Sequence, residues 1–116
     1  MYVAWRHVYP GNVRDIAFTM SNDGGKTFAA PIRVSDDRWV LDGCPEKDPA
    51  LAVDAHRRVD VVWPTLVPPA GAAGLRWLEQ PSATYPVVAV TSEGLLVAWT
   101  SGSQSNAVVR LTRLMR

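Results

Sequence analysis

The amino-acid sequence predicts an all-β protein. Nowhere along its 116 residues do apolar side chains keep the i, i+3, i+4, i+7 spacing for the roughly 10 residues that a helix requires. Nine prolines and eight glycines instead divide the chain into short runs rich in Val, Ile, Thr, Trp and Tyr, which is typical of strands joined by turns. The pattern Val-x-Trp recurs at Trp5, Trp63 and Trp99, which indicates an internal repeat.

The first three expected strands lie within residues 1–35. Residues 2–8 alternate aromatic or apolar with polar side chains, as a half-buried strand does. Residues 13–20 form a second run after a loop at residues 7–12, and residues 31–35 form a short third run that opens with a proline. Three consecutive strands are therefore expected in this part of the chain.

The later strands repeat one hairpin. Residues 48–54 followed by 59–63 match residues 85–91 followed by 95–99, and the turns between them differ in length by one residue. The strands expected here are residues 50–54, 59–63, 86–91 and 95–100, with a last strand at residues 107–114. The tryptophan spacings of 58 and 36 bracket the roughly 40–50 residues of one propeller blade. Consecutive blades are therefore expected, although a β-sandwich could also hold two similar hairpins.

Residues 68–85 interrupt this pattern. They include the run Pro-Pro-Ala-Gly-Ala-Ala-Gly, which predicts a loop or linker, and only residues 75–78 could form a strand there.

Composition excludes several classes of protein. A net charge of +1 gives no field that would attract nucleic acid or an anionic membrane surface, and no apolar run reaches the roughly 20 residues of a membrane span. The single cysteine, Cys44, excludes an internal disulfide framework and is expected to be a loop thiol. No metal site and no cofactor are expected.

The compartment is left open. The first residues lack a secretion signal and read as part of a strand, so either a cytoplasmic protein or a piece without its upstream sequence is expected. In the second case the parent protein could be secreted or periplasmic.

The most informative motif follows the second strand, at residues 21–28. In this tight turn the Asp23 carboxylate can accept backbone N–H groups, Gly25 can adopt positive φ, and the hydroxyls of Ser21 and Thr27 can tie the two sides together. Phe28 is expected to re-enter the apolar layer and anchor the turn. The order Ser-x-Asp-x-Gly-x-Thr-aromatic resembles the Asp box, or BNR repeat, of the sialidase-type β-propellers.

The resemblance implies a sialidase-type β-propeller, of which this chain would be a fragment. The family has six blades of four antiparallel strands, with the Asp box between the third and fourth strands. Residues 1–35 would then end one blade, residues 48–83 would form a degenerate second blade, and residues 84–116 would start a third. A propeller needs four to eight blades. Missing blades, supplied by other sequence or by self-association, are therefore expected.

The same resemblance indicates where a site would lie. The family's active site is on the face opposite the Asp boxes, which here carries the loops at residues 7–12 and 36–48. Sialidases hold a substrate carboxylate with three arginines and use a tyrosine nucleophile and an aspartate acid and base. The Arg-Ile-Pro signature of the first arginine is absent here, and Arg6 and Asp15 are the catalytic candidates, against the alternative of surface charge beside a turn. The residues proposed to face a ligand are Arg38, Trp39, Asp42, Glu46 and Asp48.

Two classes of function remain. One is a segment of a sialidase-like glycan-processing enzyme that is not catalytically complete alone. The other is a non-catalytic BNR propeller module that binds carbohydrate or protein. The Asp box maintains blade geometry in both classes, so it does not separate them.

Overall fold

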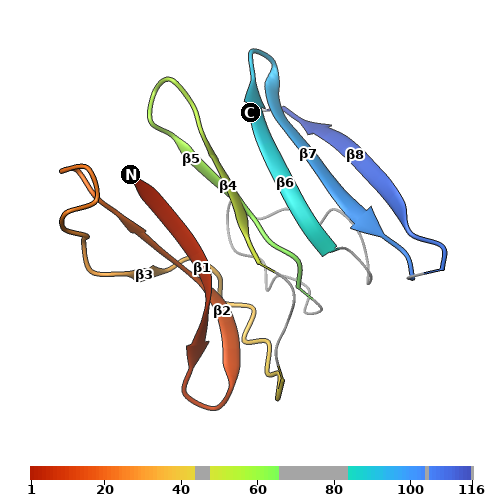
Figure 1. Ribbon diagram of the computed structural model, residues 1–116, viewed down its shortest axis with the longest axis horizontal. Helices are drawn as coiled ribbons and strands as arrows, with labels where there is room; N and C mark the ends of the chain where they lie inside the picture. The colour runs from red at the N-terminus through yellow and green to blue at the C-terminus, as the bar shows by residue number, and fades with distance from the viewer. Residues whose placement is uncertain (44–47, 66–83, 104, 116) are drawn as a thin grey trace.

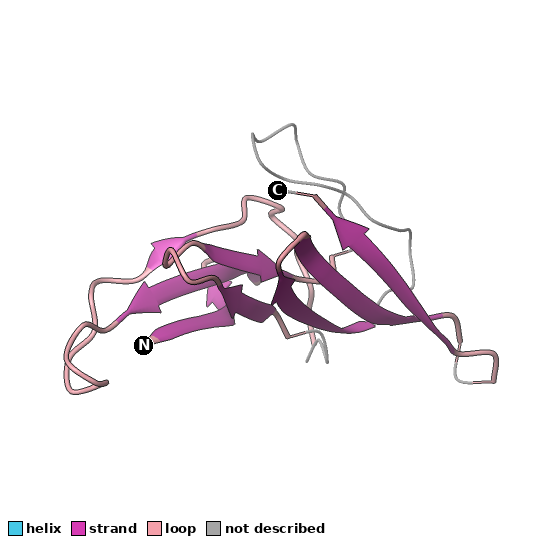
Figure 2. Cartoon of the chain, turned by 90° about the horizontal axis from the view of Figure 1, so that it is seen from above, coloured by secondary structure: helices cyan, strands magenta, loops and turns pink. Residues whose placement is uncertain are grey.

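The computed structural model describes residues 1–43, 48–65, 84–103 and 105–115. Eight strands and no helix occur in these ranges, and every strand pair is antiparallel, which confirms the all-β class (Figures 1 and 2). None of the described residues forms a helix that could cross a membrane. The strands belong to three separate sheets of three, two and three strands.

Sheet 1 contains β1 (Tyr2–Tyr9), β2 (Val13–Met20) and β3 (Ile32–Arg33) in that order. β1 and β2 form a hairpin in unbroken register, closed by a short turn in which Gly11 and Asn12 have φ of 79° and 58°. Both residue types tolerate this left-handed conformation. β3 is shorter than the expected 31–35 because a side chain takes over the pairing: the Ile16 N–H donates to the Ser35 hydroxyl at 2.8 Å.

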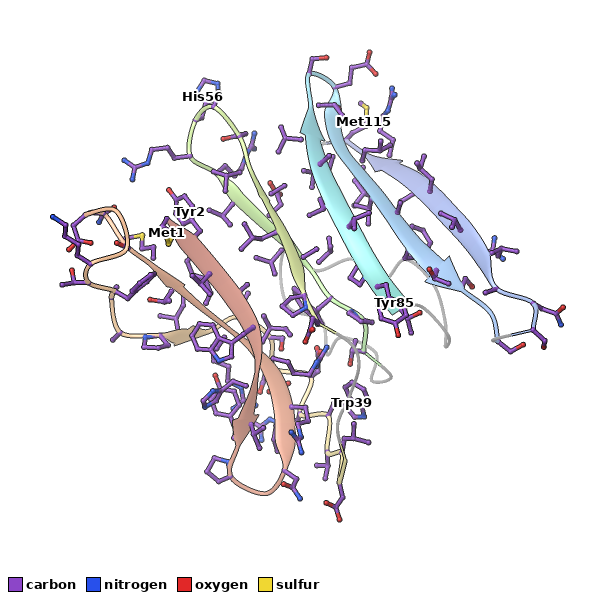
Figure 3. All side chains as sticks on the ribbon, viewed as in Figure 1. Met1, Tyr2, Trp39, His56, Tyr85 and Met115 are labelled. Atoms are coloured by element: carbon purple, nitrogen blue, oxygen red, sulfur yellow. The ribbon has the colours of Figure 1, made fainter. Side chains whose placement is uncertain are left out.

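Sheet 2 is the hairpin of β4 (Ala50–Val53) and β5 (Val59–Val62). Asp54 organises its turn, because its carboxylate accepts the N–H groups of His56 and Arg58 at 2.9 and 2.8 Å. Arg57 adopts a φ of 64° at the tip. Figure 3 shows His56 at this tip, and His56 is exposed.

Sheet 3 contains β6 (Thr84–Thr91), β7 (Gly94–Ser101) and β8 (Val108–Leu114), with β7 in the middle. A register shift between Thr84 and Val87 accommodates Pro86, which has no N–H to donate to the ladder. Gly94 is required at the start of β7, since its φ is 137° and an added Cβ would lie 2.2 Å from the Leu114 carbonyl oxygen.

The apolar core lies between sheets 2 and 3. Leu95, Val97 and Trp99 of β7 are buried there and pack with Val62 of β5 and with Val88, Val90 and Leu114 of sheet 3 itself. Sheet 1 has its own buried centre on β2, where Ile16 and Ala17 are almost fully covered. The three sheets follow one another along the molecule in chain order (Figure 1).

The expected four-stranded sheets are not seen among the described residues, whose sheets have three, two and three strands. The three Val-x-Trp copies lie in or directly after strands of three different sheets: Trp5 lies on β1, Trp99 lies on β7, and Trp63 directly follows β5. The possible strand at 75–78 lies outside the described residues.

Candidate functional site at the hairpin end of sheet 1

The Asp-box turn closes on itself through the Asp23 carboxylate. One oxygen accepts the Ser21 hydroxyl at 2.7 Å and the N–H groups of Lys26 and Thr27 at 3.0 and 2.9 Å, and the other accepts the Thr27 hydroxyl at 2.6 Å. The Ser21 hydroxyl oxygen in turn accepts the Gly25 N–H at 2.9 Å. These bonds hold the pKa of Asp23 well below its ordinary value, and the bond from the Thr27 hydroxyl lowers it most.

The prediction that Phe28 anchors this turn in an apolar layer is wrong for the described chain. Its side chain is 45% exposed. The turn does not need that anchor, because two hydrogen bonds close it: the Ala29 N–H donates to the Met20 carbonyl at 2.9 Å, and the Thr19 hydroxyl donates to the Ala29 carbonyl at 2.7 Å.

The two loops expected to carry a site lie together at the other end of sheet 1. The segment after β3 runs beside β2, where the Arg14 N–H donates to the Trp39 carbonyl at 2.7 Å. The Leu41 N–H donates to the Asn12 carbonyl at 3.2 Å, and Val13 and Val40 form an isolated bridge. The β1–β2 turn and residues 36–41 therefore form one surface, which we call the hairpin-end surface and which lies at the end of β2 away from the Asp box. Figure 3 shows Trp39 at this end and Tyr2 at the other.

Asp15 lies inside this region with its side chain 0% exposed. One carboxylate oxygen accepts the Arg38 N–H at 3.0 Å, and the other forms an ion pair with the Arg33 guanidinium, whose Nε lies 2.8 Å away. Arg33 also lies over the Tyr9 ring, with its guanidinium carbon 4.5 Å from the ring centroid. Asp15 thus fastens β2 to the chain that follows β3, and this is the environment of a positioning group.

Arg6 joins sheet 1 to sheet 2. Its guanidinium donates to the Arg14 carbonyl at 2.8 Å and to the Pro64 carbonyl at 2.6 Å, and it lies 5.1 Å from the centroid of the buried Trp39 ring. Burial lowers its pKa, and the nearby carboxylates, Asp37 foremost, act in the opposite direction. Strand alternation places Arg6 and Asp15 on opposite faces of sheet 1, since Arg6 pairs with Ile16.

Asp37 is a further buried carboxylate here. Its carboxylate accepts the Trp63 indole N–H at 2.8 Å, which links the crossover to the end of β5. Burial raises its pKa, while the hydrogen bonds from Trp63 and Thr65 oppose that rise. Asp37 belongs to the loop at residues 36–48 where a site was expected, but the sequence gave no sign of its partner, which is 26 residues away.

The proposed ligand-facing residues divide into exposed and buried groups. Arg38 is exposed, has a φ of 51° and forms an ion pair with Asp36 at 3.0 Å. Asp42 and Asp48 are exposed, whereas Trp39 is buried beneath Arg6. Glu46 and Cys44 lie outside the described residues.

We call the exposed charged side chains of Arg38, Asp42 and Asp48 the rim. Beneath the rim, the side chains of Arg6, Asp15 and Asp37 are held by hydrogen bonds within the protein. Exposed charged side chains of both signs can form hydrogen bonds with a polar, hydroxyl-rich ligand. Among the described residues, no group of three or more His, Cys, Asp or Glu side chains could hold a metal ion. Comparisons with protein-family models, with curated proteins and with solved structures found no match.

Proposed function

We propose that this chain is a segment of a sialidase-like, Asp-box β-propeller that processes glycans, and that it is not catalytically complete alone. The observation that carries the proposal is the Asp-box turn itself. Its five motif residues stand at the expected spacing, and Asp23 makes the internal hydrogen bonds that the motif requires.

The order of the connections supports the same proposal. The Asp-box turn lies near the β4–β5 hairpin, because the Arg57 side chain reaches Tyr2 and Asn22 at 3.4 Å. The β1–β2 turn and the crossover lie at the opposite end of sheet 1. In a sialidase-like propeller the ligand would bind at that opposite end, over the hairpin-end surface.

Incomplete catalysis follows from what the two catalytic candidates contact. The Arg6 guanidinium is bonded to two backbone carbonyls, and the Asp15 carboxylate is paired with Arg33. A substrate carboxylate or a leaving group would have to displace these bonds before either residue could act. Groups of a catalytic site act as a unit, so one arginine and one acid would provide little of the usual rate enhancement.

The same contacts favour a second candidate function, a non-catalytic module that binds glycans. Here the buried Arg6 and Asp15 hold the loops, and the exposed Arg38, Asp42 and Asp48 meet the ligand. Binding requires only this rim, whereas hydrolysis also requires a nucleophile and an acid.

Two measurements on the full 116-residue chain test these functions. The first is release of a fluorophore from an aryl sialoside, where no turnover is expected. Robust turnover that Arg6→Ala abolishes would show that a complete site exists in this chain.

The second measurement is titration with sialyllactose and with lactose, followed by backbone amide shifts. We expect shifts near the hairpin-end surface and weaker binding in Arg38→Gln. The matched control is Arg58→Gln, an exposed arginine at the far end of sheet 2. No binding of either sugar would contradict both glycan functions.

A further inference from the structure

Two of the three Val-x-Trp tryptophans, Trp63 and Trp99, point in the same direction along the chain. Trp99 on sheet 3 packs with Val62 of sheet 2, and the Trp63 indole after sheet 2 bonds Asp37 in the segment after sheet 1. Both tryptophans therefore point toward the preceding sheet or the segment that follows it. We call the face that carries the Val and Trp of this pattern the front of its sheet, and the other face the back.

Sheet 1 presents its front to no other described sheet. Alternation along β1 puts Arg6 on the opposite face from Val3 and Trp5, which is the back. This back face is turned toward sheet 2, because the Arg6 guanidinium donates to the carbonyl of Pro64, which follows β5. Val3 and Trp5 occupy the places that Val97 and Trp99 fill in sheet 3, but Val3 is exposed where Val97 is buried. The front continues along β1 as a row of rings, with His7 edge-on between Trp5 and Tyr9.

Sheet 3 presents its back to no other described sheet. Val87, Ala98 and Leu111 form one cross-strand row on this face, and Val109 lies beside it, opposite Thr100. Val109 and Leu111 are 78% and 63% exposed. On sheet 2 the equivalent back face carries Val62, and there it is covered by the front of sheet 3.

We propose that a second copy of this chain covers both free faces, with the back of sheet 3 of each copy packed on the front of sheet 1 of the other. The template is the contact already present between sheets 2 and 3. In each copy, the front of sheet 1 and the back of sheet 3 are the two faces that lack this contact. The inference rests on sheet packing, so it stands or falls separately from the glycan function.

The proposed contact is head-to-tail, so its geometry has two possible outcomes. Such contacts either close into a ring or continue as an open chain. Two copies bring six sheets together, within the four to eight at which propeller-like rings close. The expected assembly is therefore a closed dimer.

Sedimentation velocity of the full chain over two decades of concentration measures this state. The expected particle has twice the chain mass of 12.7 kDa. A particle of 12.7 kDa at every concentration would overturn the proposal. A mass that keeps growing with concentration would overturn the closed ring.

Two single substitutions test the head-to-tail arrangement. Leu111→Lys places a charge on the back of sheet 3, and Val3→Lys places one on the front of sheet 1. Each variant alone should sediment as a monomer, because every contact it can make contains one altered face. An equal mixture should regain dimers, because one unaltered pair of faces is then available.

The matched control is Ile32→Lys, since Ile32 is 60% exposed but lies on the back of sheet 1, off both proposed contact faces. It should dimerise like the unaltered chain. Val109→Lys is a second back-face variant in case Leu111→Lys does not fold, with circular dichroism as the check on folding. Dimers that survive Val3→Lys, or no recovery in the mixture, would refute the head-to-tail contact.

Discussion

Replacing Asp15 by asparagine tests whether this candidate catalytic residue holds the sheet together. Asparagine keeps an oxygen that can accept the Arg38 N–H, but its amide group removes the negative charge that faces Arg33. The expected result is a less stable fold whose hairpin-end surface is otherwise unchanged.

The size of the effect follows from the contacts. A hydrogen bond to a charged group contributes roughly 1.5–3 kcal/mol, and the Arg33 guanidinium makes two such bonds to Asp15. Because 35% of the Arg33 side chain is exposed, water screens part of the attraction. The expected loss for Asp15→Asn is therefore about 3 kcal/mol rather than the full sum.

Arg33→Met should cost at least as much, because it leaves a fully buried carboxylate without its cation. Breaking a buried pair from one side typically costs about 3–5 kcal/mol. The double variant removes both charges and should lose less than the two single losses combined, by about 1 kcal/mol or more.

Thermal unfolding at pH 7 and one fixed protein concentration measures all four chains. Each kcal/mol should move the midpoint by roughly 4–8 °C in a chain of this size. Concentration is fixed because any self-association would itself raise the midpoint. A midpoint within about 2 °C of the unaltered chain for Asp15→Asn would refute the structural role.

Three further outcomes are expected. The pKa of Asp37 is raised in the fold, so its contribution to stability is lost as pH rises from the ordinary pKa of 3.8 through the higher pKa of the folded state. In unfolding curves taken across pH, Asp37→Asn should make this loss smaller. The pKa of Asp23 is lowered in the fold, so its contribution to stability is instead lost as pH falls below 3.8. Asp23→Ala should lower the melting midpoint at neutral pH without changing the affinity for sialyllactose. An unchanged midpoint with lost affinity would make Asp23 a ligand-binding residue. Gly94→Ala should destabilise the fold far more than Gly24→Ala in urea unfolding, since both have positive φ but only the first would clash with Leu114; equal losses would mean that φ alone sets the cost.

The sequence by itself determined the all-β class and the position of every described strand to within a few residues. Period-two alternation and turn residues are local signals, because they record what one strand or one turn needs from its own side chains. The Asp-box turn is the clearest example, since Asp23 bonds only residues within four positions of itself. The hairpin tip at residues 56–58 is another, because Asp54 binds its own turn.

Only the tertiary structure decided what the charged residues contact. Arg6 bonds a carbonyl 58 residues away, and Asp15 pairs with an arginine 18 residues away. No local pattern encodes such partners, because they depend on how one sheet packs on the next. Alternation likewise put Val3, Trp5, Val109 and Leu111 on faces of strands without saying whether another sheet covers those faces. The exposure of Phe28 has the same cause: the turn motif marks an apolar side chain, but only a neighbouring sheet can bury it.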